Sequence, residues 1–316
     1  MIVNYIDIAD NFYFNQDVAA CIGHFDGVHL GHQALINSAI FKAKELNIKS
    51  AMITFDPDPK SILTSKVTKI LTTIEEKIKR SAYFGIDIMY IIRFDQNLAM
   101  LSANDFITKV LFRLSIRSLT CGFDFRFGNK GFGTIATLEA ALKNHIELEI
   151  IAQISHDDQK ISSTWINTLL HQGKLKLVNT LLGYPFALSG IVIKGHQVGR
   201  RLNFPTANIA YQDNQSLPKI GVYIGLIIFE NKIYQAMINV GNNPTFYQKH
   251  HTTIEAHILN FDQDIYEKQI RIIFIERLRD EIKYQNADSL IQQLNDDKIA
   301  VQKYFKINQI NMSLLL

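Results

Sequence analysis

The sequence contains little cysteine. Cys21 and Cys121 are the only two cysteines in 316 residues, and each lies at the end of a hydrophobic run. This pattern is atypical of secreted proteins that are stabilised by disulfides and of cysteine-rich metal sites. We therefore expect both cysteines to be buried, reduced side chains in a reducing compartment.

Long apolar runs and a bias of charge are also missing. No apolar run approaches the roughly 20 residues that a membrane-spanning helix needs. The 33 Lys and Arg residues nearly balance the 30 Asp and Glu residues, which argues against a nucleic-acid-binding surface. The first residues lack the basic and apolar regions of a signal peptide, so we expect a cytoplasmic protein. The sequence leaves the oligomeric state open.

Hydrophobic residues make up 47% of the chain, enough for the packed cores of about two domains. Strand-like and helix-like segments alternate from residue 18 to residue 151. This alternation predicts a Rossmann-like α/β domain, a parallel sheet with helices on both faces. The expected strands are 18–22, 49–55, 86–92, 118–121 and 147–151, and the expected helices are 31–46, 73–84, 102–114 and 134–144.

After about Leu182 the pattern changes to short strands separated by turns. The expected elements are strands at 188–193, 222–229, 233–240, 254–259 and 269–275, and an amphipathic helix at 287–305. Evenly spaced strands of this kind predict a small closed antiparallel β-barrel, here with a closing helix. We place the boundary between Gly173 and Leu188, which gives domains 1–180 and 181–316.

Residues 20–36 are the most informative stretch. A buried strand turns through glycines at 23, 27 and 31 into a helix whose first turn carries His29 and His32 on one face. Such a junction presents free backbone N–H groups and the positive end of the helix dipole, which suits phosphate. A glycine-rich turn with two surface histidines is the plainer alternative. The histidines at the junction favour a phosphate site, where they could meet developing negative charge.

Two later segments could meet this stretch in one crevice beyond the strand ends. Residues 161–164, Ile-Ser-Ser-Thr, precede a helix and form either its N-cap or a second phosphate-contacting loop. Residues 122–128 place Asp124 between phenylalanines. They form either an aromatic-rich turn or a wall for a planar ligand, with Asp124 as the polar contact.

The second domain contributes oxygen-bearing side chains. Thr206 and Asn208 lie two residues apart, so in an extended segment both project to one side, and neutral oxygen ligands beside a nucleotide suit Mg²⁺. Glu255 alternates with apolar neighbours in the middle of a strand. Such a carboxylate usually faces solvent, but at a barrel mouth that encloses a ligand it is a candidate general base for a hydroxyl. We expect His257, on the same face, to be structural.

Together these motifs resemble the prokaryotic bifunctional riboflavin kinase/FAD synthetase family over nearly the whole chain. The resemblance rests on residues 23–32, 54–59, 122–128 and 161–164 in the first half and on 204–208, 221–223, 239–241, 244–246, 254–255 and 278–279 in the second. It implies that the barrel phosphorylates riboflavin to FMN with ATP. It also implies that the first domain adenylylates FMN to FAD and releases pyrophosphate. Riboflavin, FMN and ATP are the implied ligands, with Mg²⁺ accompanying ATP.

The resemblance also implies roles for individual residues. Glu255 is the base of the kinase, and His29 and His32 stabilise the transition state of adenylyl transfer. The other implied roles are nucleotide binding by Gly23, Phe25, Asp26, Gly27, Ser163, Thr164 and Gly199, flavin binding by Asp124 and Arg279, and binding of Mg²⁺ and phosphate by Thr206 and Asn208.

Three positions depart from the family's pattern. Asn167 stands where an Arg usually follows, three residues after Thr164, and Asp58 stands where the family often has a basic residue or His. Both changes remove positive charge that would stabilise the transition state of adenylyl transfer. Asn203 replaces a glycine, but Asn tolerates the left-handed backbone better than most residues.

Two alternatives to a bifunctional enzyme stay open. One is a riboflavin kinase whose adenylylation domain is weak or silent, which Asn167 and Asp58 motivate. The other is a non-catalytic flavin-binding or regulatory protein. The presence of Thr206, Asn208 and Glu255 together argues against the second alternative.

Overall fold

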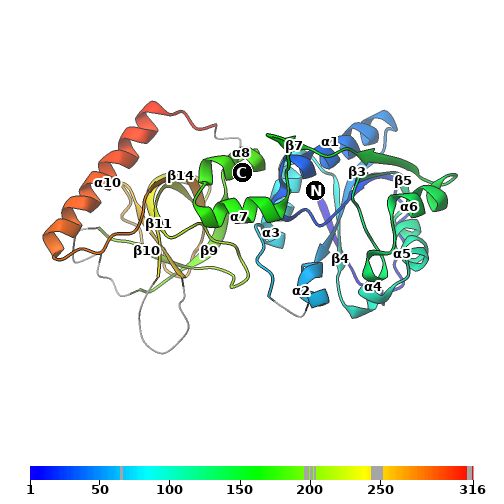
Figure 1. Cartoon of the computed structure of the whole chain (residues 1–316), viewed down its shortest axis with the longest axis horizontal. Helices are drawn as coiled ribbons and strands as arrows, with labels where there is room; N and C mark the ends of the chain where they lie inside the picture. The colour runs from blue at the N-terminus through cyan, green and yellow to red at the C-terminus, as the bar shows by residue number, and fades with distance from the viewer. Residues whose placement is uncertain are drawn as a thin grey trace. The chain divides into compact units, whose positions relative to one another are not determined.

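The computed structural model describes residues 1–64, 67–195, 199, 202, 204–242, 252–311 and 315. Asn203 and the 244–246 segment lie outside the described residues. The chain divides into two compact units, Met1–Ser163 and Thr164–Leu316 (Figure 1). In the part of the chain that the structure describes, no helix is both long and apolar enough to cross a bilayer.

The first unit is built on a six-stranded sheet. Its strands are β1 (Ile2–Ile6), β2 (Val18–Ile22), β3 (Lys49–Asp56), β4 (Ile88–Arg93), β5 (Ile116–Gly122) and β6 (Glu147–Ile151). They are ordered β1-β4-β3-β2-β5-β6, and every neighbouring pair is parallel. The predicted Rossmann-like sheet is therefore confirmed, with β1 as an additional edge strand.

Helices cover both faces of this sheet (Figure 1). They are α1 (Leu30–Glu45), α2 (Pro59–Thr64), α3 (Ile74–Phe84), α4 (Gln96–Met100), α5 (Ala103–Lys109) and α6 (Ile135–Leu142). Helices α1 and α3 pack with Met52 and Met89 in one core, whereas α5 and α6 pack with Ile53 and Tyr90 in the other. Alternate residues of the central strands thus feed two cores, as in a sheet buried on both faces.

Local signals predicted several boundaries correctly and one helix wrongly. The Thr73 hydroxyl accepts a hydrogen bond from the Glu76 N–H at 3.3 Å and caps α3, which Gly85 ends in the left-handed conformation. The predicted helix 102–114 is instead α5 followed by a 3₁₀ turn, Leu111–Leu114. The 3₁₀ spacing places Leu111 and Leu114 on one side, and both are buried in the core. Cys21 and Cys121 are buried and free, as expected.

The strand order brings two of the predicted motifs to one place. On one side of β2 lie β3, β4 and β1, in that spatial order, whereas β5 and β6 lie on its other side. In such sheets, ligands bind beyond the carboxyl ends of the strands where the order reverses. The loops that follow β2 and β5 contain residues 23–29 and 123–128, so both motifs lie at this reversal.

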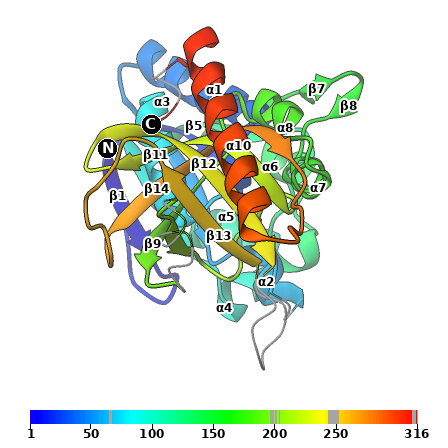
Figure 2. The ribbon, with the colours of Figure 1, turned by 90° about the vertical axis from the view of Figure 1, so that its left-hand side faces the viewer.

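The second unit contains a closed antiparallel barrel. Its strands are β9 (Ala187–Ile193), β10 (Ala207–Ala210), β11 (Gly221–Phe229), β12 (Lys232–Asn242), β13 (Thr252–Ile258) and β14 (Gln269–Arg279). They close in the order β10-β13-β12-β11-β14-β9. Helix α10 (Ala287–Ile307) lies across the barrel (Figure 2), where Val301 packs with Val222 and Met237. The predicted barrel with its closing helix is confirmed.

Two further helices, α7 (Ser163–Gln172) and α8 (Leu175–Leu182), precede the barrel. The Asn179 amide donates to the carbonyl oxygens of Phe274 and Ile275 at 3.1 and 3.2 Å, which ties α8 to β14. The compact units consequently part at Ser163, before the boundary predicted from the sequence. The assignment of the two activities to residues 1–180 and 181–316 remains a prediction.

Candidate active sites

The loop after β2 is held in a conformation that its residues make possible. Gly27 adopts a φ of 79°, in the left-handed region that glycine favours. Phe25 has a φ of 55°, and its side chain is completely buried. A non-glycine residue in this region persists only where its surroundings determine it, and such residues cluster at functional sites. The buried Phe25 ring therefore fixes the backbone that the sequence predicts to contact phosphate.

Asp26 ties this loop to neighbouring segments. Its Oδ1 accepts hydrogen bonds from the N–H groups of Leu71 and Thr72 at 2.8 and 3.0 Å. Its carbonyl oxygen accepts a hydrogen bond from the Ser163 hydroxyl at 2.8 Å. Burial raises the pKa of the Asp26 carboxyl. The structure thus gives the carboxylate a role in shaping the loop, while the nucleotide contacts of Asp26 and Ser163 stay predictions.

His29 and His32 lie together at the start of α1. Their rings stack with centroids 3.6 Å apart, and Nδ1 of His29 accepts a hydrogen bond from the His32 N–H at 3.3 Å. His29 is therefore the N-cap of α1. An accepting Nδ1 assigns the proton of the neutral ring to Nε2, which remains able to donate to a ligand. In the described structure, Nδ1 of His32 is buried and has no hydrogen-bond partner.

The histidines of this region are uncharged at neutral pH. Burial lowers the pKa of His24 and of His29 to about 4, and it lowers that of His32 well below its usual value. Neutral imidazoles donate hydrogen bonds but contribute no formal positive charge. The histidine pair can thus stabilise a developing oxyanion by hydrogen bonding, and any formal charge must come from other residues.

These low pKa values predict that acid destabilises the first unit. In the unfolded chain a histidine titrates near its usual value of 6.5. Between that pH and about 4 the unfolded state binds more protons, so the free energy of unfolding falls as the pH falls through this window. We expect urea unfolding at about pH 7.5, 6 and 5 to show this decline. His29→Asn should reduce its slope, and an equal slope in both proteins would contradict the assignment.

A buried lysine lies beside the loop after β2. Lys77 on α3 is 4% exposed, and its ammonium donates to the His24 carbonyl at 2.7 Å and to the Thr54 hydroxyl at 3.2 Å. Burial lowers the pKa of Lys77 to about 8, although Asp26, Asp56 and Asp58 oppose the shift. The sequence analysis missed Lys77, because a lysine on a predicted helix is usually solvent-facing.

Asp58 is one of the carboxylates near Lys77. Its Oδ1 lies 3.6 Å from Nε2 of His24, and its Oδ2 accepts a hydrogen bond from the Thr68 hydroxyl at 2.7 Å. The carboxylate thus faces the loop and also helps to balance the charge of Lys77. Position 58 is therefore acidic in this chain, and the positive charge near it is that of the buried Lys77.

The loop after β5 is aromatic, as the sequence predicts. The Phe125 and Phe127 rings are stacked with centroids 5.7 Å apart, and Phe123 is 42% exposed. The Asp124 carboxylate forms an ion pair with Lys160, a residue that the sequence analysis missed. An exposed aromatic ring next to a charged pair is compatible with a planar ligand, and the flavin contact of Asp124 stays a prediction.

The remaining residues of the 161–164 motif lead into α7. Thr164 belongs to the second unit and is exposed. Asn167 lies one helical turn after Ser163, on the same face of α7. Its Oδ1 is buried and has no hydrogen-bond partner among the described residues. The departure at 167 has therefore left an unsatisfied polar atom on the face that carries Ser163.

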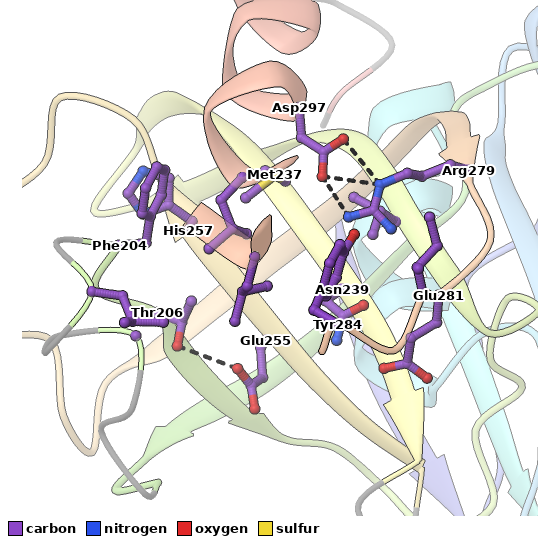
Figure 3. Close-up of a pocket in the computed structure, with 16 residues that line it drawn as sticks. Phe204, Thr206, Met237, Asn239, Glu255, His257, Arg279, Glu281, Tyr284 and Asp297 are labelled. Carbon is purple, nitrogen blue, oxygen red and sulfur yellow. Dashed lines mark hydrogen bonds and ion pairs between the residues drawn. The ribbon is translucent and has the colours of Figure 1, made fainter. Parts of the chain in front are cut away.

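A pocket of about 340 Å³ opens in the barrel (Figure 3). Glu255 on β13 is paired with Asn208 on β10 and with Asn239 on β12. Directly paired residues on neighbouring strands project to the same face, so these three form one row. The Thr206 hydroxyl donates to Oε2 of Glu255 at 3.3 Å, and Thr206, Asn239 and Glu255 line the pocket. Glu255 thus faces a cavity and not open solvent.

Gly199 and His257 shape the segment that carries Thr206. The Phe204 N–H donates to the Gly199 carbonyl at 2.8 Å, and a Cβ at position 199 would lie only 2.3 Å from the Phe204 carbonyl oxygen. Glycine is therefore required there. Nδ1 of His257 is hydrogen-bonded to the Pro205 carbonyl at 2.8 Å. This contact supports the structural role predicted for His257, whereas the nucleotide contact of Gly199 stays a prediction.

Arg279 connects the pocket to the closing helix. Its Nε lies 3.0 Å from both carboxylate oxygens of Asp297 on α10, and its Nη2 lies 2.6 Å from Oδ2 (Figure 3). Asp297 is 3% exposed, so this multidentate pair is shielded from water. Arg279 and Asp297 both line the pocket. The flavin contact predicted for Arg279 is untested, and the structure shows that the residue holds α10 on the barrel.

The sequence analysis missed several pocket residues. Asn239 belongs to the quoted segment 239–241 but received no role, although its position opposite Glu255 follows from strand pairing. Asp297 and Tyr284 lie in or before a helix where nothing in the local pattern distinguishes them. The Tyr284 hydroxyl is buried and has no hydrogen-bond partner among the described residues.

Comparisons with known proteins place each unit in a family. An FAD synthetase family model matches residues 12–165, and a riboflavin kinase family model matches residues 182–305. A bifunctional riboflavin kinase/FMN adenylyltransferase of Bacillus subtilis is 34% identical over 288 residues, covering 90% of this chain and 91% of that protein. A protein of the same name from Buchnera aphidicola subsp. Schizaphis graminum is 38% identical over 299 residues, covering 93% and 96%.

One solved structure resembles both units. It is described as a macrolide-efflux protein from Streptococcus pneumoniae, and it matches with a TM-score of 0.88 and 28% sequence identity. The match covers 96% of this chain and 99% of that chain.

Proposed function

Because the chain belongs to the family of bifunctional riboflavin kinase/FMN adenylyltransferases, we propose that it performs both reactions. The second unit phosphorylates riboflavin to FMN, and the first adenylylates FMN to FAD. The observation that supports this most strongly is the row of Asn208, Glu255 and Asn239, of which Glu255 and Asn239 line a pocket of the barrel. The cytoplasm remains the predicted location.

In the kinase reaction Glu255 is the general base. It accepts the proton of the riboflavin 5′-hydroxyl as that oxygen bonds to the γ-phosphorus and the bond to ADP breaks. The hydrogen bond from Thr206 orients the carboxylate toward the pocket. Arg279 and Asp297 keep α10 on the barrel and thereby maintain one wall of the pocket.

Thr206 and Asn208 would hold Mg²⁺ next to the ATP phosphates. Thr206 offers a hydroxyl oxygen and Asn208 an amide oxygen beside the Glu255 carboxylate, and hard oxygen ligands of this kind suit Mg²⁺. The ion supplies neutralisation of phosphate charge when it is bound. The residues present therefore fit the metal that the family resemblance implies.

In the adenylylation reaction an oxygen of the FMN phosphate bonds to the α-phosphorus of ATP, and pyrophosphate leaves. The loop after β2 and the start of α1 hold the nucleotide phosphates. The neutral rings of His29 and His32 donate hydrogen bonds to the charge that develops on the phosphoryl oxygens. Lys77 donates a hydrogen bond to the His24 carbonyl and so holds this part of the loop in place.

Product analysis tests the proposal. The full chain is incubated with Mg-ATP and either riboflavin or FMN, and the flavins are separated by chromatography. We expect riboflavin to yield FMN and then FAD, and FMN to yield FAD directly. Absence of both FMN and FAD in the first reaction would support the non-catalytic alternative. Normal turnover of FMN would remove the alternative of a silent first unit.

A second candidate function is a riboflavin kinase that adenylylates FMN slowly. The buried Oδ1 of Asn167, which has no hydrogen-bond partner among the described residues, supports it. We expect Asn167→Arg to restore a cation on the face of α7 that carries Ser163, and to raise the rate of FAD formation by roughly tenfold or more. The measurement is the rate of FAD formation from FMN. Thr168→Arg, at an exposed neighbouring position of α7, is the control. If Asn167→Arg brings no increase, the family's arginine is dispensable in this chain.

A further inference from the structure

Lys160 lies at the edge of the adenylylation site and has no role in the reactions described above. Its ammonium forms an ion pair with Asp124 and lies 4.8 Å from the centroid of the Phe123 ring. Its side chain is 39% exposed, so the charged group borders solvent. The pair therefore links β8 (Gln159–Lys160) to the loop after β5.

The residues next to Lys160 pack against the loop after β2 and the first turn of α1. The Ile161 carbonyl oxygen lies 4.0 Å from the position that a Cβ would occupy at Gly31, on the first turn of α1. The Ser163 hydroxyl reaches the Asp26 carbonyl at 2.8 Å. Lys160 is consequently placed between the loop after β5 and the loop after β2. Burial is the main cause that lowers the pKa of His29 and of His32, and the positive charge of Lys160 lowers both further.

The adenylylation site binds phosphate groups, so it needs a positively charged side chain that can reach them. Its histidines are neutral, and Lys77 is buried with its ammonium bonded to protein oxygens. Lys160 is different, because its partner is an exposed carboxylate on a neighbouring loop. Exposed ion pairs contribute little to stability, whereas a charged hydrogen bond to phosphate is among the stronger polar contacts. A substrate phosphate can therefore displace Asp124 at little cost.

We propose that Lys160 is a phosphate-binding residue of the adenylylation site, which Asp124 holds until a substrate phosphate replaces it. The inference rests on the proposed function of the first unit. The ligand is a phosphate group, from either ATP and its pyrophosphate product or FMN. No covalent step involves Lys160, because it contributes only a charged hydrogen bond.

The test uses the full chain and measures FAD formation from FMN. We expect Lys160→Met to lower kcat/KM by roughly tenfold to a hundredfold, while the phosphorylation of riboflavin stays unchanged. If the phosphate belongs to the nucleotide, KM for ATP and Ki for pyrophosphate rise. If it belongs to FMN, KM for FMN rises and Ki for pyrophosphate does not. Lys160→Arg, which keeps the charge, should restore most of the loss.

The matched control is Lys49→Met. Lys49 also forms an exposed ion pair, with Asp87 at 3.2 Å, but it begins β3 and so lies at the amino-terminal ends of the strands, opposite the carboxyl ends. Equal kinetic constants for wild type, Lys160→Met and Lys49→Met would overturn the proposal. A wild-type protein that makes no FAD would instead reject the proposed function itself, so the two failures can be told apart.

Asp124→Asn tests the exchange of partners. If Asp124 competes with the phosphate for Lys160, removing its charge lowers the KM or Ki of the phosphate ligand that responds to Lys160→Met. The same substitution in a Lys160→Met background should have no such effect. An equal change in both backgrounds would contradict the competition.

Discussion

Glu255→Gln is expected to slow the formation of FMN from riboflavin by roughly 10²–10⁴-fold, the range for loss of a general base. Gln has nearly the same shape and can still accept the hydrogen bond that Thr206 donates at 3.3 Å. The pocket should therefore keep its structure and its affinity for riboflavin. The loss should appear in kcat, measured by chromatography of the flavin products under saturating Mg-ATP.

Two comparisons make this result specific. Glu276→Gln changes another carboxylate in the middle of a barrel strand, one that is exposed and lies outside the pocket lining. It should leave FMN formation unchanged. The conversion of FMN to FAD by the Glu255→Gln protein should also be normal. A Glu255→Gln protein that retains wild-type kcat for FMN formation would show that this carboxylate is not the base.

His29→Asn is the second substitution with a large expected effect. Asn is a favoured N-cap and can accept the hydrogen bond of the His32 N–H, so α1 should remain capped. The substitution removes the Nε2–H that the structure leaves available to a ligand. We expect the rate of FAD formation to fall by roughly 10²–10³-fold, as for loss of one donor to a developing oxyanion. FMN formation from riboflavin should be unaffected.

His145→Asn is a suitable control, because His145 is exposed and follows α6, away from the phosphate loop. Thermal unfolding of both variants separates a kinetic effect from a loss of structure. If His29→Asn keeps the wild-type rate of FAD formation, hydrogen bonding by this ring has no part in the reaction. If it unfolds early, His29→Gln provides a second variant that also lacks the imidazole.

Much of the fold was predictable because its strongest signals are local. The apolar run of β2 and the capping residue Thr73 depend only on neighbouring residues. The four residues of β10 show one buried side chain, so no period was visible there. Helix α8 was missed for a different reason. Its place in the second unit depends on hydrogen bonds from Asn179 to β14, which are far away in the sequence.

The sites were less predictable than the fold. Glu255, His29 and His32 belong to recognisable motifs, and the structure places them at a pocket and at a helix N-terminus. Lys77 and Lys160 carry no local signal, because only tertiary packing decides which lysine is buried and which meets Asp124. Helix α3 even directs Lys77 and Arg80 inward, against the usual pattern of an amphipathic helix. The partners of the two lysines are far away in the sequence: His24 and Thr54 for Lys77, and Asp124 for Lys160.

The central claim is that one chain carries out two different phosphate transfers. It is tested most directly by supplying riboflavin with ATP labelled either at the γ-phosphorus or at the α-phosphorus. We expect the γ-label to enter FMN and the FMN half of FAD, and the α-label to enter FAD alone. An α-label that never enters a flavin would contradict adenylylation, and a γ-label that enters neither FMN nor FAD would contradict the kinase.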